Sequence, residues 1–528
     1  MRRPLLLNGF MATGKTSVGR AVAERLGRPF LDLDAEIALR AGSSVAEIFA
    51  RSGEAAFRAL EREALRDVLE TSHAAAPVVA LGGGALVRRE QRLFALDRAV
   101  VVTLEAPVEE CVRRARCSGE ERPLLAGDPA GRAAELLEAR RIAYAECHAR
   151  VRTDGRSIEA LSREVAAIWE RDPLAVAAGE RSYSVEIGRN LLGARLADLV
   201  GAAPRVVLVT DETVFSLHGA AATSALAPVQ PIVVALPPGE EHKHIGAVER
   251  IWRAALEGGA DRGARVVGFG GGVVTDIAGF AAATYQRGVA WVGVPTTLLA
   301  MVDASVGGKT GVDLAQAKNA VGAFWQPSAV LCDVELLATE SPRGFRSALA
   351  EVVKTALIGD PELLDLVEAE APTLARGVGE HTAEIVHRSI RVKARIVSAD
   401  EREAGLRALL NLGHTVGHAL EACAGYTRLT HGEAVSLGLV AALRIGVRRG
   451  FTPPSLAERV ERLLAALGLP VNVAAEPLED AARLLGHDKK RAGKKLRFVV
   501  ARAPGAVETT ELALDELAAE TRALAAAS

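Results

Sequence analysis

Cysteines are few and scattered in this chain of 528 residues, and none of them forms a C-x-x-C pair. The five are Cys111, Cys117, Cys147, Cys332 and Cys423, a pattern typical of a reduced, cytoplasmic protein. Long apolar runs are also missing, because no stretch reaches the roughly 18 consecutive apolar residues that a membrane helix needs. The opening "MRRPLLLNG" resembles a signal peptide only briefly, since its apolar run is too short.

An excess of charge of one sign is absent as well. The chain carries 64 basic and 66 acidic residues, which gives a net charge of −2. Nothing in this balance favours nucleic acid or an anionic membrane as a partner. We therefore expect small-molecule substrates, with no nucleic-acid or membrane partner.

What is present is the pattern of several α/β and helical domains, because one hydrophobic core rarely serves 528 residues. In the first half, short β-rich runs such as "PLLLNG" and "AVVVTLEA" alternate with helix-like stretches, which indicates a parallel sheet with flanking helices. A second α/β pattern begins near "RVVLVTD", and long helical periodicities dominate later. We expect an α/β domain over residues 1–172, a linker over 173–182, an α/β domain over 183–340 and a mainly helical domain over 341–528.

The stretch "GFMATGKTS" satisfies the phosphate-loop pattern G-x-x-x-x-G-K-[ST] through Gly9, Gly14, Lys15 and Thr16. It follows an apolar strand and opens a helix-like run, where backbone N–H groups and a helix N-terminus can cradle phosphate. Lys15 would reach the β- and γ-phosphates of ATP, and the Thr16 hydroxyl would ligate Mg²⁺. The plainer interpretation is a glycine turn before a helix.

Side chains that suit phosphoryl transfer follow the phosphate loop. Asp32 and Asp34 stand two apart on a predicted strand, so both should point to one face, one holding magnesium and the other accepting a proton from an attacking hydroxyl. Later stretches add a glycine turn and arginines that could clamp a carboxylate or phosphate: Arg58, Gly82, Gly83, Gly84, Arg122 and Arg140. Taken singly, each arginine is more often a solvated surface charge.

The second α/β domain contains a glycine-rich turn after a strand, "GFGGGVVTDIAG", whose spacing differs from G-x-G-x-x-G. Consecutive glycines still let a backbone approach a pyrophosphate closely. The following stretch gathers polar groups among small residues, namely Thr296, Thr297, Asp303, Lys309 and Lys318. That density of polar groups is unusual for a core and predicts a dinucleotide site.

Histidines in "NLGHTVGHALE" indicate a metal site, since His414 and His418 lie four apart on one predicted helix face, although Thr415 replaces the Glu of H-E-x-x-H. His431 and Glu351 supply further ligands, and two His with one Glu leave an open position on a catalytic zinc. Alternatively, these histidines are ordinary core residues of apolar helix faces. Groups that suit an anionic substrate flank the site: Lys354, Lys393, Arg407, Asn411 and His418.

Taken together, the residues of the first half resemble a shikimate kinase. The resemblance implies that Asp34, Arg58, Gly82, Gly83 and Arg140 bind shikimate, and that Asp34, Lys15 and Arg122 are catalytic. It implies an ATP site formed by Gly9, Ala12, Thr13, Gly14, Lys15, Thr16, Ser17, Arg114 and Arg122, with Mg²⁺ on Thr16 and Asp32. Ala12 stands where the family often has Gly, and the lid loop "RARCSGEE" is slightly long.

From about residue 180 to 505 the chain resembles a 3-dehydroquinate synthase, through stretches that include "PPGEEHK", "GGGVVTD", "KNAVGAFWQP", "NLGHTVGHALE" and "HDKK". The resemblance implies that Glu351, His414 and His431 hold Zn²⁺ or Co²⁺, whereas His418 joins the substrate site. The implied NAD site comprises Asp211, Pro238, Gly239, Glu240, Glu241, His242, Lys243, Gly271, Gly272, Val273, Val274, Thr275, Asp276, Thr296, Thr297, Lys309, Lys318, Leu336, Leu337, Ala338 and Thr339.

The same resemblance implies a substrate site comprising Arg287 (for the phosphate), Asp303, Lys309, Asn319, Lys354, Lys393, Arg407, Asn411, His414, His418, His431 and Lys489. Of these, Lys309, Lys354, Arg407 and His418 are expected to be catalytic. Thr275 and Asp313 replace residues that are often Gly and Asn in the family, and both are expected to be tolerated.

The two resemblances imply a bifunctional enzyme: a P-loop kinase joined to a synthase that has an α/β NAD-binding domain and a mainly helical domain. The kinase would phosphorylate shikimate with MgATP. The synthase would convert 3-deoxy-D-arabino-heptulosonate 7-phosphate to 3-dehydroquinate and phosphate with NAD⁺ and a metal ion, and we expect it to form a homodimer. One alternative is a metal-dependent polyol dehydrogenase, which has no need of Lys309, Lys354, Lys393 and Arg287 together. The other is that one half is a catalytically dead regulatory module, yet neither half has lost a motif residue.

Overall fold

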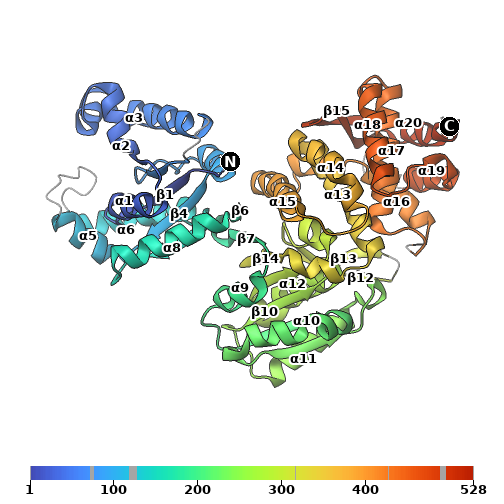
Figure 1. Cartoon of the computed structure of the whole chain (residues 1–528), viewed down its shortest axis with the longest axis horizontal. Coiled ribbons are helices and arrows are strands. Elements are labelled where there is room, and N and C mark those ends of the chain that lie inside the picture. The colour runs from blue at the N-terminus through green and yellow to red at the C-terminus, as the bar shows by residue number, and fades with distance from the viewer. Residues whose placement is uncertain are drawn as a thin grey trace. The chain divides into compact units, whose positions relative to one another are not determined.

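The computed structural model describes residues 2–71, 76–117, 128–315, 317–425, 427–487 and 495–526. The chain divides into two compact units, Met1–Glu186 and Ile187–Ser528 (Figure 1). None of the helices in this described part is both long enough and apolar enough to cross a membrane.

The first unit is built on a parallel five-stranded sheet with the strand order β2-β3-β1-β4-β5. Its strands are β1 (Leu5–Gly9), β2 (Phe30–Asp32), β3 (Val78–Ala80), β4 (Val100–Glu105) and β5 (Ala149–Arg152). Its helices are α1 (Lys15–Leu26), α2 (Leu33–Ala41), α3 (Val45–Glu70), α4 (Arg89–Arg98), α5 (Val108–Cys117), α6 (Pro129–Ala139), α7 (Arg141–Ala145) and α8 (Ile158–Arg171).

Both faces of this sheet are covered, because successive side chains of β1 point in opposite directions. Leu6 belongs to one buried cluster with residues of α2, α3 and α4, whereas Leu5 and Leu7 pack in another with residues of α1 and α8. The sequence expectation of a parallel sheet with flanking helices is therefore confirmed. One detail was wrong: β2 ends at Asp32, so Asp34 lies in the first turn of α2 and not on a strand.

The segment after α8 is structured. Residues of β6 (Leu174–Val176) pair antiparallel with β7 (Tyr183–Gly188), and a 3₁₀ turn, η2 (Gly179–Arg181), lies between them. Ala175 and Ala177 pack into the core of the first unit, so this segment is part of a folded body.

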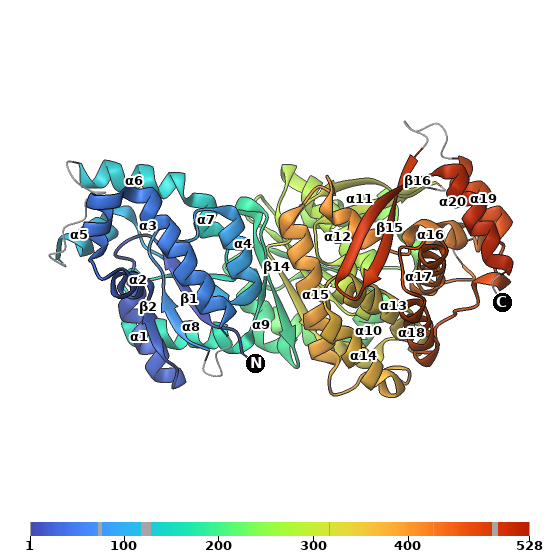
Figure 2. The ribbon, with the colours of Figure 1, turned by 90° about the horizontal axis from the view of Figure 1, so that it is seen from above.

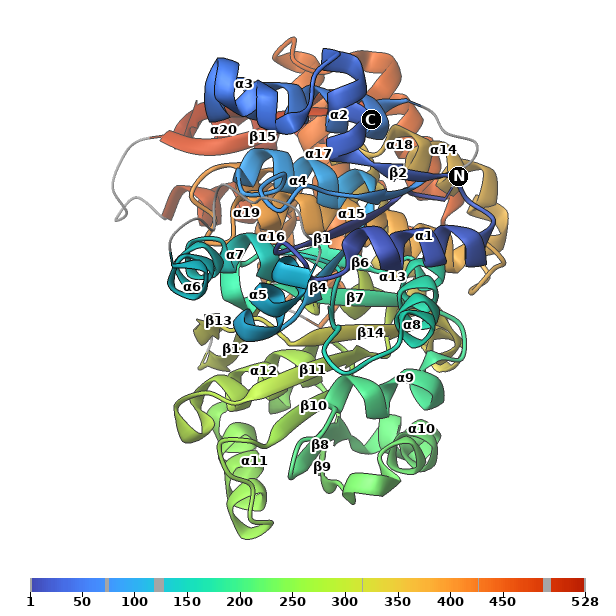
Figure 3. The ribbon, with the colours of Figure 1, turned by 90° about the vertical axis from the view of Figure 1, so that its left-hand side faces the viewer.

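In the second unit, parallel strands lie side by side in the order β14-β11-β10-β8-β9 (Figure 3). They are β8 (Val206–Asp211), β9 (Ile232–Leu236), β10 (Arg265–Gly270), β11 (Ala290–Pro295) and β14 (Ala329–Asp333). The accompanying helices are α9 (Leu191–Val200), α10 (Glu212–Ala225), α11 (Ile245–Glu257) and α12 (Gly272–Thr284). Four short 3₁₀ helices, η3 (Ala227–Val229), η4 (Glu240–His242), η5 (Tyr285–Arg287) and η7 (Val334–Thr339), and a π-helix, η6 (Ala300–Ala304), complete the set.

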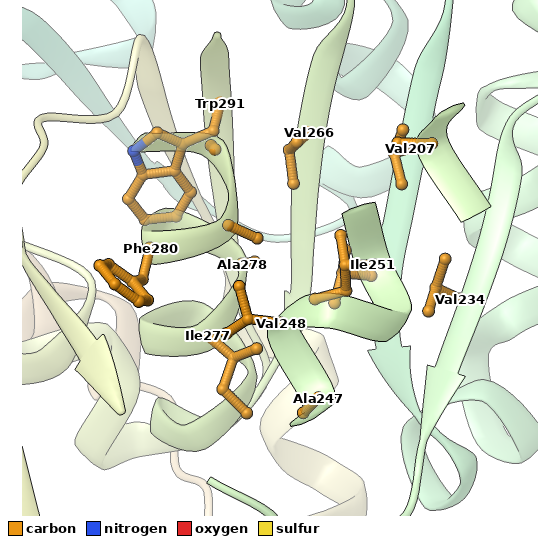
Figure 4. Close-up of a cluster of buried hydrophobic side chains, with 14 of the residues drawn as sticks. Val207, Val234, Ala247, Val248, Ile251, Val266, Ile277, Ala278, Phe280 and Trp291 are labelled. Atoms are coloured by element: carbon orange, nitrogen blue, oxygen red, sulfur yellow. The ribbon is translucent and has the colours of Figure 1, made fainter. Parts of the chain in front are cut away.

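Apolar side chains of α11 and α12 pack on one face of this sheet (Figure 4). Ile251 of α11 lies near Val207, Val234 and Val266 of the strands, and Ile277 of α12 belongs to the same buried cluster. This packing fixes the N-terminus of α12 at the carboxyl end of β10, the edge at which open α/β sheets bind ligands.

The remainder of the second unit is mainly helical. Its helices are α13 (Pro342–Gly359), α14 (Pro361–Leu374), α15 (Thr382–Ala399), α16 (His414–Cys423), α17 (His431–Arg448), α18 (Pro454–Ala466), α19 (Leu478–His487) and α20 (Leu514–Arg522), with the short turns η8 (Leu406–Asn411), η9 (Val473–Ala475) and η11 (Ala523–Ala526). Two antiparallel hairpins complete it: β12 (Lys309–Leu314) with β13 (Ala317–Phe324), and β15 (Lys495–Ala503) with β16 (Ala506–Ala513). The second hairpin, which contacts α13 and α17 (Figure 2), was not expected, because its strands follow a long series of helical signals.

Candidate active sites

The predicted phosphate loop joins β1 to α1 in the first unit. Gly9 and Gly14 have φ angles of 135° and 98°, and a Cβ on Gly9 would lie 2.3 Å from the carbonyl oxygen of Leu104, so both positions favour glycine. Ala12 has a φ of 59°, which a glycine would adopt at lower cost. The Lys15 ammonium donates to the carbonyls of Gly9 and Phe10, at 2.9 and 2.8 Å. The loop therefore places a cation and a helix N-terminus together, which suits a phosphate group.

Two aspartates lie beside this loop. The Thr16 hydroxyl donates to Oδ2 of Asp32 at 3.0 Å, and Asp32 also caps α2. Oδ1 of Asp34 is buried and has no hydrogen-bond partner among the described residues. Burial raises the pKa of Asp34, and the nearby charge of Asp32 adds to the shift. Asp34 thus offers a poorly solvated acceptor beside the phosphate loop.

The residues that the resemblance assigns to shikimate converge on the same place. A Cβ on Gly82 would lie 2.7 Å from both Oδ1 of Asp34 and Oε1 of Glu61. Arg58 donates to Glu61 at 2.7 Å, and Arg140 donates to the carbonyl of Gly83 at 3.0 Å. The structure therefore brings two arginines, the carboxylates of Asp34 and Glu61, and a glycine turn together. Glu61 was missed, although its place three residues after Arg58 on one helix could have revealed it.

The remaining ATP-site predictions are placed in part. Arg114 on α5 donates to Glu110 at 2.6 Å and to the carbonyl of Thr153 at 3.1 Å. The Thr13 hydroxyl is buried and donates to the carbonyl of Phe10 at 2.8 Å. Arg122 lies outside the described residues.

In the second unit, a cavity of about 400 Å³ lies at the carboxyl ends of β8, β10 and β11. The predicted NAD residues that line it are Asp211, Pro238, Gly239, Gly271, Gly272, Val273, Val274, Thr296, Thr297 and Thr339. Oγ1 of Thr296 is buried there without a partner among the described residues, so the cavity offers a free hydroxyl to a ligand. Thr213, His218 and Glu340 also line it and were missed.

Other predicted NAD residues lie outside the lining of this cavity: Glu240, Glu241, His242, Lys243, Thr275, Asp276, Lys309, Lys318, Leu336, Leu337 and Ala338. The Lys243 ammonium contacts Asp276 at 2.7 Å and Asn319 at 2.6 Å, which connects the turn η4 to α12 and to the hairpin β12–β13.

The three predicted metal ligands lie close together, two of them at the starts of helices and one within a third helix. His414 is the first residue of α16, His431 is the first residue of α17, and Glu351 lies on the buried helix α13. Both Nε2 atoms lie 3.4 Å from Oε1 of Glu351, a buried oxygen that has no hydrogen-bond partner among the described residues. One ligand atom from each side chain lies within 4.8 Å of the others. Two imidazoles and an otherwise unsatisfied carboxylate fit a zinc-like cation.

His418 offers a second geometry, because His418, Glu421 and His431 also have ligand atoms within 4.8 Å of one another. The ring centroids of His414 and His418 are 4.9 Å apart. Glu421 was missed, although it lies seven residues after His414 in the same helix, a spacing that returns to the same face.

Basic groups surround the predicted metal ligands. Lys354 lies 2.5 Å from Oε2 of Glu351, and Lys393 lies 2.5 Å from Oδ1 of Asp303. Burial lowers the pKa of Lys393, with Asp303 opposing the shift. Arg407 is buried and donates to the carbonyls of Gly307 and Glu401. These cations suit an anionic substrate.

Four further residues were predicted to bind the substrate, and two of them share a carboxylate partner. Lys309 forms an ion pair with Glu403, and Asn411 donates to the same carboxylate at 3.1 Å. Arg287 is exposed at the end of η5. Lys489 lies outside the described residues.

Comparisons with known proteins agree with the division of the chain into two units. Residues 11–169 match the model of the shikimate kinase family, residues 233–347 match that of the 3-dehydroquinate synthase N-terminal domain, and residues 348–491 match that of the C-terminal domain. The chain is 48% identical over 342 residues to 3-dehydroquinate synthase of Halorhodospira halophila, covering 64% of this chain and 96% of the relative. It is 44% identical over 345 residues to the synthase of Jannaschia sp., covering 63% and 93%.

The chain belongs to the 3-dehydroquinate synthase family. It also carries a shikimate kinase domain, so it is a bifunctional shikimate-pathway enzyme with kinase and lyase activities. Both family resemblances and the mixed α/β fold predicted from the sequence are thereby confirmed. Among solved structures, the synthase unit is similar to ValA, a 2-epi-5-epi-valiolone synthase from Streptomyces hygroscopicus subsp. jinggangensis with NAD⁺ and Zn²⁺ bound. The TM-score is 0.60, with 30% identity over 66% of this chain and 97% of that one.

Proposed function

We propose that the first unit transfers the γ-phosphoryl group of ATP to the 3-hydroxyl of shikimate through the residues that surround the phosphate loop. Lys15 and the N-terminus of α1 bind the phosphates, and Thr16 and Asp32 hold Mg²⁺, which neutralises charge on the transferring group. Asp34 accepts the proton of the attacking hydroxyl, since its unpaired Oδ1 faces the same turn as Gly82. Arg58 and Arg140 bind the substrate carboxylate.

The second unit, in this proposal, converts 3-deoxy-D-arabino-heptulosonate 7-phosphate to 3-dehydroquinate and phosphate. The observation that carries its cofactor requirement is the unpaired Oε1 of Glu351 between two imidazoles. Glu351, His414 and His431 would hold Zn²⁺ or Co²⁺, which would supply Lewis-acid polarisation of a substrate alcohol. The cavity at the carboxyl ends of β8, β10 and β11 would hold NAD⁺, which would supply reversible hydride transfer. The cofactors bound to ValA support this assignment.

The chain's own residues supply binding and proton transfer around these cofactors. Lys354, Lys393 and Arg407 are buried cations that hold the anionic substrate and exclude water from it. His418 lies next to the proposed ligands; it binds the substrate and does not bind the metal ion. A polyol dehydrogenase would gain nothing from so many buried cations, and neither unit has lost its motif residues, so the two alternatives have less support.

We further propose that the enzyme works in the cytoplasm, that its synthase unit forms a homodimer, and that it binds no nucleic acid. The scattered cysteines, which form no disulfide in the described chain, support the first of these, and the balanced charge supports the last.

Metal analysis of two purified variants tests the ligand assignment. His431→Ala is expected to lose both bound metal and synthase activity, while its kinase activity remains. His418→Ala is expected to retain one metal ion per chain and to turn over slowly or bind substrate weakly. A metal-free His418→Ala protein alongside a metal-replete His431→Ala protein would contradict the assignment.

A further inference from the structure

Glu421 is a buried carboxylate beside the candidate metal site that has no role in the scheme above. It lies on α16 and is 5% exposed. One of its oxygens, Oε2, lies 3.3 Å from Nδ1 of His431. The other, Oε1, accepts a hydrogen bond from the Lys318 ammonium at 3.1 Å. Each oxygen therefore has a different partner.

The two ring nitrogens of His431 consequently face two different carboxylates. Nε2 lies 3.4 Å from Oε1 of Glu351, and Nδ1 lies 3.3 Å from Oε2 of Glu421. A neutral imidazole carries its proton on one nitrogen only. When a cation occupies the place beside Oε1 of Glu351, the carboxylate of Glu421 would keep the proton on Nδ1 and leave the Nε2 lone pair for that cation.

Lys318 gives Glu421 a fixed orientation and a compensated charge. It comes from β13, and its ammonium lies 3.1 Å from Glu421 and 3.8 Å from Glu240. Both oxygens of Glu421 therefore have partners, whereas Glu351 pairs with Lys354 through Oε2 alone and keeps Oε1 without a hydrogen-bond partner among the described residues. Glu351 thus retains an oxygen for a cation, and Glu421 is better suited to orient the imidazole of His431.

We propose that Glu421 is a positioning residue that holds His431 in its Nδ1-protonated form and thereby increases the zinc affinity of Glu351, His414 and His431. This role rests on the metal site of the proposed function. It assigns Glu421 no direct contact with substrate or metal.

The test is the zinc affinity of the full-length, metal-free chain, measured by competition with a chelator. Glu421→Gln keeps the size of the side chain but removes the charge that faces Nδ1, so it is expected to weaken zinc binding about 10–100-fold. The matched control is Glu433→Gln. Glu433 lies on α17 two residues after His431 and pairs with Arg343 at 2.7 Å, and its capping-box position accepts Gln. This control is expected to bind zinc like the unsubstituted chain.

An unchanged zinc affinity in Glu421→Gln would overturn the proposal. Two zinc ions per unsubstituted chain, one of which is lost in Glu421→Gln, would also overturn it, because Glu421 would then be a ligand. If Glu421→Gln does not fold, Glu421→Asp decides, since its shorter carboxylate should weaken zinc binding several-fold and an unchanged affinity would again overturn the role.

His414→Ala separates this inference from the metal site itself. If His414→Ala binds zinc as tightly as the unsubstituted chain, the proposed ligand set is wrong. If His414→Ala is zinc-free while Glu421→Gln binds normally, the ligand set stands and only the role of Glu421 is wrong.

Discussion

At the residue scale, each active site contains a buried carboxyl oxygen without a hydrogen-bond partner in the described chain: Oδ1 of Asp34 and Oε1 of Glu351. Leaving such an atom unpaired costs roughly 1–3 kcal/mol, and more for a charged group. These oxygens therefore lower stability in the absence of ligands. We attribute them to binding, of a shikimate hydroxyl at Asp34 and of a metal ion at Glu351.

The first prediction concerns Asp34→Asn. Asparagine keeps the shape but removes a charge that burial and Asp32 both disfavour, so the thermal stability of the kinase unit should stay the same or rise. The kinase kcat should fall about 10²–10⁴-fold because a general base is lost. Asp67→Asn, which removes an exposed carboxylate paired with Arg40, is the control and should keep full activity. A fully active Asp34→Asn enzyme would contradict the assignment of the base.

The second prediction concerns pH and Glu340. Burial raises the pKa of Glu340 from its ordinary 4.5 to about 7, although the hydrogen bond that Glu340 accepts from the Leu298 N–H opposes the shift. The folded state thus holds this proton more tightly than the unfolded state, and stability falls as the pH rises from about 4.5 through about 7. Glu340→Gln should therefore raise the melting temperature of the NAD-free synthase unit by roughly 2–4 °C at pH 8. It should have little effect at pH 5, and calorimetry that found equal gains at both pH values would contradict this account.

At the element scale, both sites are built where regular elements begin or end. The phosphate loop lies between β1 and α1, the proposed NAD cavity lies at three strand ends, and two of the proposed metal ligands are the first residues of α16 and α17. Helix α17 starts at His431 because Thr430 and Glu433 form a capping box. Gly413, with a φ of 79°, starts α16 at His414.

Much of this could be predicted from the sequence, because glycine loops and histidine spacings are local signals. The phosphate loop and the strand before it were expected from a short motif, and the proposed metal ligands were predicted from the histidine spacing together with the family resemblance. Contacts between distant segments could not be predicted in the same way. The pairing of Lys318 with Glu421 joins residues 103 positions apart, and the hairpin β15–β16 is stabilised by packing against α13 and α17. Asp34 was misplaced because a three-residue strand gives too little periodicity to show where it ends.

The third prediction concerns the segment that follows α8. The backbone N–H of Gly179 donates to the buried carboxylate of Glu146 at 3.0 Å, and Arg3 donates to the carbonyl of Pro173 at 2.6 Å. A fragment of residues 1–172 lacks these partners, whereas residues 1–186 keep them. The shorter fragment should lose roughly 1–3 kcal/mol of unfolding free energy in urea titrations. Equal stability of the two fragments would show that this segment contributes nothing to the kinase fold.

At the scale of the whole molecule, the two activities do not share an intermediate. The synthase releases 3-dehydroquinate, whereas the kinase accepts shikimate, so the product of one unit is not the substrate of the other. We therefore attribute no direct transfer of product to the fusion of the units.

The fourth prediction follows from this independence. Fragments 1–186 and 173–528, which both retain the segment that follows α8, should reproduce the rates of the intact chain when mixed at equal concentration. Steady-state assays of each reaction measure this directly. A marked loss of either rate in the mixture would show that covalent linkage matters.

The central claim, that one chain carries two separate active sites, is tested most directly by assaying both reactions on three purified full-length proteins. The unsubstituted chain should catalyse both. Lys15→Ala should lose kinase activity by at least about 10²-fold and keep full synthase activity, because only the phosphate contact is removed. His414→Ala should lose synthase activity and keep full kinase activity. If either substitution abolished both reactions in a folded chain, or if neither substitution affected its own reaction, the account of two independent sites would be contradicted.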